Sequence, residues 1–179
     1  MSTMSASIVA FPTALGLCAV RWTEEGIASV RLPSPGTAAL PRLAELAPGA
    51  VPPAVLAAIE GIVAVLDGAS RDLHEAVLDE RELDPLRRAV YAATRRIPPG
   101  TTMTYGEVAR AIGRTDPEAA RVVGAALARN PYPVVVPCHR VLGANGRLTG
   151  FSAPGGLETK RRMLELEGAP GYGQQVLFG

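Results

Sequence analysis

The chain has 179 residues, of which 47% are hydrophobic and 20% charged, and its formal net charge is +1. This size and composition suit one globular domain or two small ones that share a core. No apolar run approaches membrane-spanning length, so we expect no membrane association. Arg21 is the first basic residue and Pro12 interrupts the apolar start, which argues against a signal peptide.

Cysteine and histidine are scarce. Cys18 and Cys138 are the two cysteines, and His74 and His139 are the two histidines. Two cysteines make no disulfide framework, and the four residues have no spacing typical of zinc ligands. We therefore expect a protein of the reducing cytoplasm, without a metal or another cofactor.

Charge is distributed unevenly along the chain. Residues 1–84 carry 5 Lys or Arg against 11 Asp or Glu, whereas residues 85–179 carry 13 against 6. Such a division favours an N-terminal domain over residues 1–84 and a C-terminal domain over residues 85–179. A basic half is what a nucleic-acid contact confined to one domain needs, although charge alone leaves a chance distribution equally open.

The N-terminal half predicts a small sheet and one helix. Residues 17–22 and 27–32 are apolar-rich runs joined by a turn that ends at Gly26, which indicates a β-hairpin. Residues 33–51 are rich in Pro, Gly and Ala and predict a loop. Pro52 and Pro53 then open a helix that ends at Gly68.

The C-terminal half predicts helices with recognisable caps. Asp84 caps a helix whose first residue is Pro85 and which ends before residues 98–100. The capping-box pair Thr104 and Glu107 begins a second helix that runs to Gly113. The apolar stripe expected on the first of these helices consists of Leu86, Ala89, Val90, Ala93 and Ile97.

A third helix begins at Asp116 and Pro117 and runs to about Arg129, so a three-residue turn separates it from the second. Together the two predict a helix-turn-helix. The third helix is rich in small residues and carries Arg121. These residues pack a tight core or present a close-fitting surface to a DNA groove, and the pattern leaves both interpretations open.

Residues 134–136 predict a short buried strand, which places Cys138 where a strand meets a loop. A thiol is mostly protonated at neutral pH, and the thiolate is the nucleophile, so Cys138 needs a base and a positive environment. His139 and Arg140 could supply them, but His139 needs a turn or a bridging water to reach the sulfur. An inert, buried cysteine remains the alternative.

A last helix is predicted over residues 157–167, with Gly168 after its end. Glu165 and Glu167 lie in its last turn, where the helix dipole disfavours a carboxylate. That position indicates that one of the two acids is kept for a purpose, such as orienting an imidazole.

Several motifs in this order resemble the O6-alkylguanine-DNA alkyltransferases, also called methylated-DNA-protein-cysteine methyltransferases. They are IPPG at residues 97–100, TYGEVA at 104–109, ARVVGA at 120–125, NPYP at 130–133, PCHRV at 137–141, GGL at 155–157 and LELEG at 164–168. Together these motifs cover residues 84 to 168 with the order of the family and nearly its spacing.

This resemblance implies that Cys138 takes an alkyl group from the O6 atom of guanine in one in-line displacement, after which the protein is spent. His139 would deprotonate Cys138 through a water, and Glu167 would orient that histidine. Tyr105 would donate a hydrogen bond or proton to the departing guanine. Asn130 would tie the helix-turn-helix to the cysteine loop.

The resemblance also implies a partner, double-stranded DNA that contains O6-alkylguanine, with no obligate protein partner. The second helix of the helix-turn-helix would lie in the minor groove, and Arg121 would replace the flipped nucleotide in the stack. The DNA contacts expected on this basis are Thr104, Ala119, Ala120, Arg121 and Gly124.

For the fold, the resemblance implies an α+β protein, in which a small N-terminal ribonuclease-H-like sheet domain precedes a mostly helical, winged helix-turn-helix-like alkyltransferase domain. Carbonyls of Cys138 and Val141 would recognise the guanine amino group. The pocket residues expected are Leu127, Pro133, Val141, Phe151, Ser152, Ala153 and Lys160. Relative to the family, Ala153 and Pro154 are extra residues in the loop 150–156 and should reshape that wall.

Three other functions compete with this reading. A Cys-His hydrolase usually takes the pair from distant parts of the chain and needs an oxyanion site that the sequence does not reveal. A lesion-binding alkyltransferase-like protein lacks the cysteine, whereas Cys138 is present. A transcription factor leaves the PCHRV segment unexplained.

Overall fold

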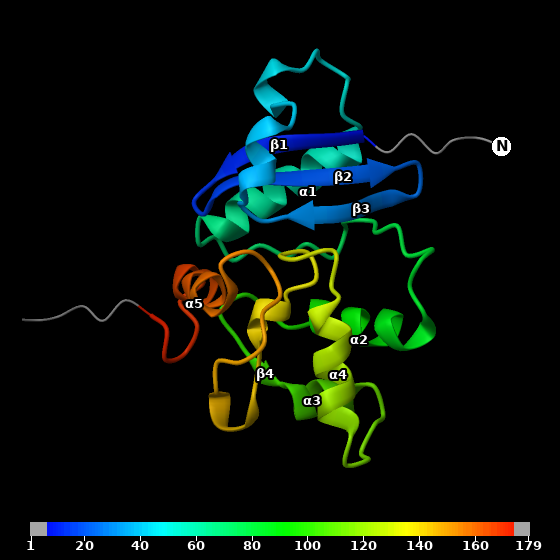
Figure 1. Cartoon of the computed structure of the whole chain (residues 1–179), viewed down its shortest axis with the longest axis vertical. Helices are drawn as coiled ribbons and strands as arrows, with labels where there is room; N and C mark the ends of the chain where they lie inside the picture. Colours follow the sequence, from blue (N-terminus) through cyan, green and yellow to red (C-terminus); the bar gives the residue numbers. More distant parts are fainter. Residues whose placement is uncertain (1–6, 174–179) are drawn as a thin grey trace, which may run out of the picture.

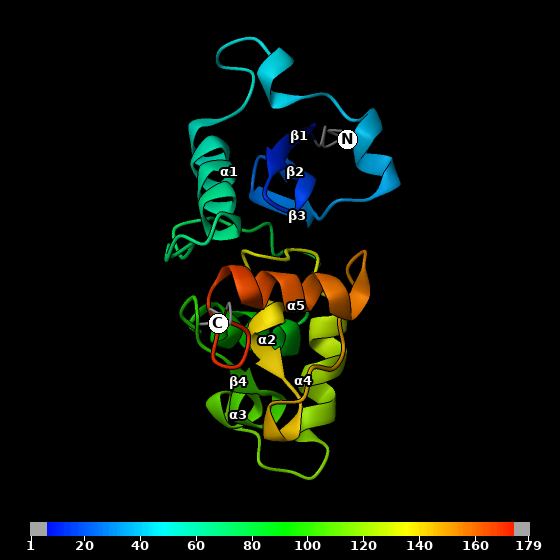
Figure 2. The same ribbon diagram turned by 90° about the vertical axis from the view of Figure 1, so that its left-hand side faces the viewer.

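The computed structural model describes residues 7–173 and has a mixed α/β fold (Figure 1). A small antiparallel sheet and helix α1 form one end of the elongated molecule, and helices α2 to α5 form the other end. Figure 2 shows α1 beside the sheet and α5 along the junction of the two parts. Within residues 7–173, no helix is both long and apolar enough to cross a bilayer.

The sheet has strand order β1-β2-β3 and is built from β1 (Ser7–Thr13), β2 (Gly16–Thr23) and β3 (Gly26–Arg31). The predicted hairpin between β2 and β3 is confirmed. Gly26 is required at its turn, because its φ is 137° and a Cβ there would lie 2.5 Å from the Val77 carbonyl oxygen. Strand β1 was not predicted, since Pro12 interrupts its pattern, but as an edge strand it tolerates proline.

Helix α1 (Pro53–Leu66) packs beside the sheet as its apolar periodicity predicts. Its residues Val55, Ile59, Ile62 and Leu66 are buried in the core. The segment before it contains two short 3-10 turns, Pro35–Ala39 and Leu43–Glu45, where the sequence predicted a plain loop.

Helix α2 (Pro85–Arg95) begins as predicted, because the side chain of Asp84 accepts a hydrogen bond from the backbone N–H of Arg87. Its predicted apolar stripe is wrong at Ala89, which is exposed. Tyr91 is buried instead and donates a hydrogen bond of 2.8 Å to the carbonyl of Ala126 in α4. Tyr91 therefore links α2 to α4. A search for aliphatic periodicity does not detect such a contact, because the residue is aromatic.

Helix α3 (Tyr105–Ala111) follows the two-residue strand β4 (Met103–Thr104) and has the predicted capping box. Helix α4 (Ala119–Ala128) begins later than predicted. Asp116 and Pro117 form a turn instead, in which the Asp116 carboxylate accepts from the Glu118 N–H and its carbonyl from the Ala119 N–H. The connection from α3 to α4 is therefore residues 112–118 rather than three residues.

The predicted strand over residues 134–136 is wrong. Val134 has a φ of 73°, and the Val136 N–H donates to the Tyr132 carbonyl at 2.8 Å, so this apolar run is a tight turn. A 3-10 turn (Cys138–Arg140) follows, and strand β5 (Val141–Leu142) then pairs in parallel with β4. A further 3-10 turn (Ala144–Gly146) and helix α5 (Gly156–Leu166) complete the described chain.

The segment before Cys138 also joins the two ends of the molecule. The Val30 N–H of β3 donates to the Pro131 carbonyl at 2.9 Å, and the Tyr132 hydroxyl donates to the Asp79 carbonyl. Buried residues of the sheet, of α1 and of α2 to α4 belong to one continuous core. The position of the sheet is therefore coupled to the segment that carries the cysteine.

Tyr132→Phe should lower the free energy of unfolding by about 1–2 kcal/mol, because the Asp79 carbonyl would lose its buried donor. Chemical denaturation of the whole chain measures this loss. Tyr172→Phe is the matched control, since its hydroxyl has no hydrogen-bond partner in residues 7–173. Equal stabilities of the two variants would contradict the proposed link.

Candidate functional site

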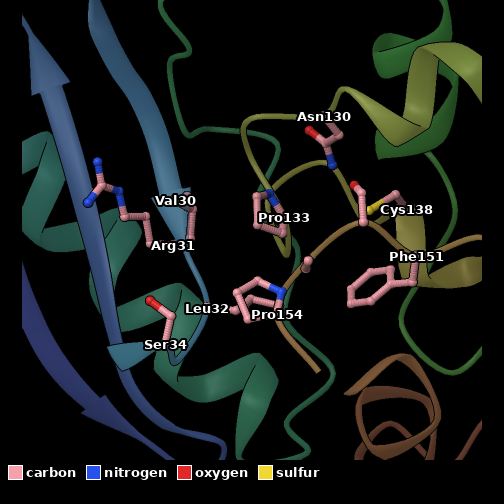
Figure 3. Close-up of a pocket in the computed structure, with 11 residues that line it drawn as sticks. Val30, Arg31, Leu32, Ser34, Asn130, Pro133, Cys138, Phe151 and Pro154 are labelled. Carbon is pink, nitrogen blue, oxygen red and sulfur yellow. The ribbon is translucent and has the colours of Figure 1, made fainter. Parts of the chain in front are cut away.

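Cys138 lies at the start of the 3-10 turn Cys138–Arg140 and is partly exposed. Its side chain contributes to the walls of two cavities, one of about 230 Å³ and one of about 400 Å³. Figure 3 shows the sulfur with Phe151 on one side of the larger cavity. The thiol is therefore accessible to a small molecule, unlike Cys18, which is fully buried.

Asn130 fixes the backbone that leads to the cysteine. Its Nδ2 donates to the Val136 carbonyl at 2.9 Å, and its Oδ1 accepts from the Tyr132 N–H at 2.9 Å. One amide thus bridges both ends of the turn in which Val134 adopts its left-handed conformation. Because this turn directly precedes Cys138, Asn130 determines where the sulfur lies.

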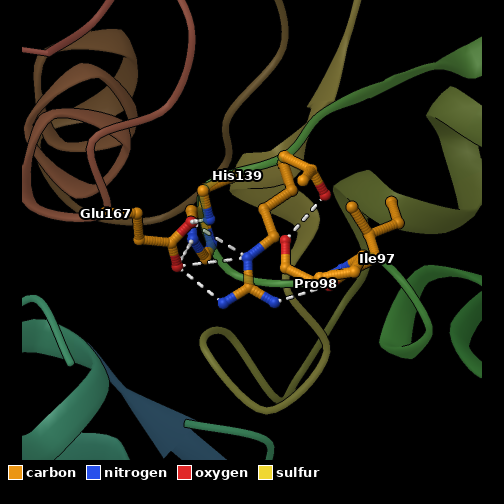
Figure 4. Close-up of polar contacts among 7 residues, drawn as sticks. Ile97, Pro98, His139 and Glu167 are labelled. Carbon is orange, nitrogen blue, oxygen red and sulfur yellow. Dashed lines mark hydrogen bonds and ion pairs between the residues drawn. The ribbon is translucent and has the colours of Figure 1, made fainter. Parts of the chain in front are cut away.

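Glu167 joins His139 and Arg140, the two residues that follow the cysteine in the chain (Figure 4). His139 Nε2 lies 2.8 Å from Glu167 Oε1, and Arg140 donates from Nε and Nη2 to the same carboxylate at 2.6–3.1 Å. A fourth arginine bond, from Nη1, reaches the Ile97 carbonyl at 2.7 Å. The side chains of His139, Arg140 and Glu167 are at most 6% exposed, so this hydrogen-bond network is buried.

The protonation states follow from these contacts. Burial opposes ionisation of Glu167, but hydrogen bonds from His139 and Arg140 together with the charge of Arg140 outweigh it and lower its pKa to about 2. Burial lowers the pKa of His139, so its imidazole is neutral at pH 7. The neutral ring donates from Nε2 to the carboxylate, which leaves Nδ1 as an acceptor. Nδ1 is buried and has no partner within residues 7–173.

Burial raises the pKa of Cys138, although Asn130 and Lys160 act in the opposite direction. The resting side chain is therefore a thiol rather than a thiolate at neutral pH. Nucleophilic attack then requires a base that removes the proton at the moment of reaction. Neutral His139, the neighbouring residue, has the right protonation state for this task.

Lys160, a predicted pocket residue, is completely buried and lines neither of the two cavities. Its Nζ donates to three carbonyls, those of Val141 at 2.6 Å, Thr149 at 2.7 Å and Gly150 at 3.2 Å. Burial lowers its pKa to about 8, and the ammonium lies 5.7 Å from the centre of the Tyr105 ring. Lys160 thus ties β5 to the loop that closes over the cysteine.

The smaller cavity is lined by Tyr105, Gly124, Leu127, Ala128, Cys138, Gly150, Phe151 and Ser152. In this structure the Tyr105 hydroxyl donates to the Thr149 carbonyl at 3.1 Å. Burial raises the pKa of Tyr105, so the phenol is a proton donor. A ligand with an acceptor atom could take over this hydrogen bond inside the cavity.

A wider groove of about 770 Å³ runs along α4 and opens beside the smaller cavity. Four of the five predicted DNA contacts, Thr104, Ala120, Arg121 and Gly124, line this groove, and Tyr105 lines both hollows. The Arg121 side chain is 79% exposed and is paired with Glu118. Ala119 does not belong to this surface, because it faces the core and is 4% exposed.

The remaining predicted pocket residues divide between the cavities. Leu127 lines the smaller one, Pro133 and Ala153 the larger one, and Phe151 and Ser152 both. Val141 is buried, and its carbonyl accepts a hydrogen bond from Lys160.

Sequence reasoning missed that Arg140 shares Glu167 with His139 and that β3 lines the larger cavity. The position of Arg140 next to His139 was an available signal for the shared carboxylate. The place of β3 in the cavity wall is a contact between distant segments, which the sequence does not signal.

Glu167 should make the free energy of unfolding depend on pH in the acid range. Its pKa is lowered from 4.5 to about 2, so its contribution is present above pH 4.5 and is lost as pH falls toward 2. We expect this loss to be about 3 kcal/mol, since one pKa unit corresponds to about 1.4 kcal/mol. Thermal unfolding between pH 7 and pH 2 should show a shallower acid slope for Glu167→Gln than for the wild type. Glu165→Gln, on the same helix, should keep the wild-type slope, and identical slopes for all three would contradict the assignment.

The comparisons with known proteins identify the family of the chain. Residues 85–169 match the family model described as 6-O-methylguanine DNA methyltransferase, DNA binding domain. A methylated-DNA–protein-cysteine methyltransferase of Methanosarcina acetivorans is 51% identical over 83 residues, which are 46% of this chain and 51% of that protein. The chain thus spans about half the length of the first curated relatives it matches.

Two further comparisons extend over most of the chain. A methylated-DNA–protein-cysteine methyltransferase of Methanothermobacter thermautotrophicus is 35% identical over 156 residues, covering 87% of this chain and 81% of that protein. The crystal structure of Mycobacterium tuberculosis OGT in complex with DNA superimposes with a TM-score of 0.67 at 31% identity, covering 91% and 94% of the two chains. On this evidence the chain belongs to the methylated-DNA–protein-cysteine methyltransferase family.

Proposed function

We propose that this protein is a DNA repair alkyltransferase that moves an alkyl group from the O6 atom of guanine to its own Cys138. The observation that carries the proposal is the partly exposed thiol at the junction of two cavities, next to a buried imidazole that a carboxylate orients. The names of the relatives support the same activity.

The reaction is an in-line displacement at the alkyl carbon. His139 Nδ1 accepts the Cys138 proton through a bridging water, and the sulfur forms a bond to the carbon while the carbon–O6 bond breaks. Glu167 holds the imidazole in the tautomer that leaves Nδ1 free, and it stabilises the imidazolium that forms. Because the thioether is not cleaved again, each molecule reacts once.

The guanine occupies the cavity of about 230 Å³. Tyr105 exchanges its hydrogen bond with the Thr149 carbonyl for one to the ring, and donates a proton as the base leaves. The carbonyls of Cys138 and Val141 accept from the guanine amino group, Leu127 forms a wall of this cavity, and Pro133 forms a wall of the larger cavity that adjoins it at Cys138. A proton donated to the departing base lowers the energy of an otherwise anionic leaving group.

The groove along α4 receives duplex DNA through its minor groove. Thr104, Ala120 and Gly124 allow close approach of the backbone, and exposed Arg121 enters the stack when the damaged nucleotide turns into the cavity. The complex of the Mycobacterium tuberculosis relative with DNA supports DNA as the partner. A reducing cytoplasm suits a protein whose function depends on a free thiol.

We also propose a domain type for each half of the chain. The N-terminal half, residues 1–84, is a ribonuclease-H-like domain, supported by its antiparallel β1-β2-β3 sheet with α1 alongside. The C-terminal half, residues 85–179, is a winged helix-turn-helix-like domain, supported by the packing of α3 against α4 and by the β4-β5 pair.

Alkyl transfer to Cys138 is tested directly by mass. After incubation with a duplex oligonucleotide containing O6-methylguanine, intact-mass analysis should show one added methyl group, and peptide analysis should place it on Cys138. Cys138→Ala should gain no mass, whereas Cys18→Ala should still be methylated. Binding of the lesion without any mass gain by the wild type would instead indicate a lesion-binding protein.

Arg121→Ala tests entry of the base from the duplex. The rate constant for duplex O6-methylguanine should fall at least about tenfold, equivalent to about 1.4 kcal/mol, because the vacated stack loses its replacement. Reaction with the free base O6-methylguanine should change less than about twofold, a difference of under 1 kcal/mol. Arg162→Ala on α5 is the control and should leave both rates as they are. Equal losses on both substrates would rule out this role for Arg121.

A further inference from the structure

The carboxyl end of α5, which carries Glu167, lies against two glycines with left-handed backbones. Gly68 follows α1 and has a φ of 87°, and Gly100 follows α2 and has a φ of 78°. One glycine comes from each half of the chain. Both halves therefore contact the helix end from which the carboxylate projects.

Gly68 ends α1 in a hydrogen-bonded cap. Its N–H donates to the Val65 carbonyl at 3.0 Å, and the Ala69 N–H donates to the Ala64 carbonyl at 2.9 Å, the pattern in which a left-handed glycine follows a helix. A Cβ at Gly68 would lie 2.8 Å from the Leu166 carbonyl oxygen, closer than such atoms approach in proteins. Figure 2 shows the end of α1 close to the end of α5. The last residue of α5 thus packs against a backbone that has no side chain.

Gly100 lies in the turn after α2. The Thr101 N–H closes this turn by donating to the Pro98 carbonyl at 3.2 Å, and Gly100 is its third residue, the position that needs a positive φ in a type II turn. The Gly100 N–H donates to Glu167 Oε2 at 3.3 Å, and a Cβ on Gly100 would lie 3.1 Å from the Glu167 carbonyl oxygen. Gly100 therefore contacts both the side chain and the backbone of Glu167.

The geometry of this helix end decides how Glu167 meets His139. The Glu167 carboxylate lies 2.8 Å from His139 Nε2, also accepts from Arg140, and is 2% exposed. Groups that act together in catalysis must be held to within roughly 0.5 Å of their working positions. A Cβ at either glycine would force a backbone carbonyl of residues 166–167 to move, and the carboxylate with it.

We propose that Gly68 and Gly100 are positioning residues for the alkyl transfer. Because they carry no side chain, they fix the helix end from which Glu167 orients His139. The inference rests on the proposed function, in which His139 accepts the Cys138 proton. Neither glycine lines a cavity that contains Cys138, so the effect passes through the helix end and not through a substrate contact.

The test measures the rate constant for methylation of Cys138 by the free base O6-methylguanine, which removes any effect on DNA binding. At neutral pH, Gly68→Ala and Gly100→Ala should each react at least about fivefold more slowly than the wild type, because a displaced carboxylate orients the general base less well.

Gly49→Ala is the matched control. Gly49 has a φ of 84°, and a Cβ there would meet no atom of residues 7–173 within 4 Å. This variant has the same backbone strain without the contact, so it should react at the wild-type rate.

The pH dependence of the rate constant separates positioning from a loss of folded protein. Burial lowers the pKa of His139, and the hydrogen bond and charge of Glu167 raise it. The charges of Arg140 and Lys160 also lower it. A weaker bond to Glu167 lowers the pKa of His139 further, so the acid limb of the profile should move to lower pH in both glycine variants. Unfolded protein would reduce the fraction of Cys138 that is methylated and leave the midpoint of that limb unchanged.

NMR spectroscopy gives a readout that does not need the reaction. The His139 Nε2–H donates to Glu167, and a proton in such a bond resonates downfield. This resonance should move upfield in Gly68→Ala and Gly100→Ala and stay in place in Gly49→Ala. His74, the other histidine of the chain, is exposed and serves as an internal reference.

The outcomes separate this inference from the function on which it rests. If the wild type is methylated and both glycine variants match Gly49→Ala in rate constant, midpoint and resonance, the positioning role is overturned and the alkyltransferase stands. No methylation of the wild type would overturn the proposed function, and an unmoved resonance would then overturn the effect on His139 as well. If Gly68→Ala fails to fold, judged by thermal unfolding, Gly68→Asn replaces it with Gly49→Asn as its control, because asparagine tolerates a positive φ better than alanine.

Discussion

The structure of the site depends on one buried carboxylate. Glu167, at the end of α5, binds His139 and Arg140 together, and Arg140 in turn reaches the Ile97 carbonyl after α2. A carboxylate at the end of a helix is disfavoured by the helix dipole, so the arginine supplies the charge that stabilises it there. The same contacts that orient the imidazole also hold α5 and α2 against the cysteine turn. A substitution that breaks the bonds of Glu167 would therefore alter both the packing of α5 and the orientation of the imidazole.

A second constraint acts from the opposite side of Cys138. Asn130 closes the turn before the cysteine, and Tyr132 and Pro131 attach that turn to the N-terminal half. The sulfur is thus positioned by the Asn130 amide, which binds the turn before Cys138, and by the Glu167 carboxylate, which binds the two residues after it. This arrangement explains how a short segment without regular strand structure can present a side chain with little freedom. It also makes the sheet part of the site, because β3 is bonded to the cysteine-bearing segment.

Sequence patterns predicted the elements whose signals are local. The caps at Asp84 and Thr104 place α2 and α3 correctly, because a cap needs residues within one turn. Residues 134–136 are apolar enough for a strand, yet Asn130 bends them into a turn through bonds that no periodicity records. The His139–Glu167 contact was expected from the family motifs. The role of Arg140 was missed although its place next to His139 was a signal, whereas the approach of β3 to Cys138 depends on long-range packing, which a single sequence does not contain.

The pairing of Arg121 with Glu118 has a consequence for the search along DNA. With undamaged duplex in the proposed groove, the guanidinium must leave a carboxylate three residues away before it can insert, and that carboxylate then faces the phosphates unpaired. Glu118 thereby competes with the DNA for the Arg121 side chain. Because both side chains are largely exposed, the ion pair is weak, and the contacts made by the proposed insertion at a weakened base pair can replace it. In the proposed single-turnover reaction, insertion at weakened base pairs would keep the Cys138 thiol for a damaged base.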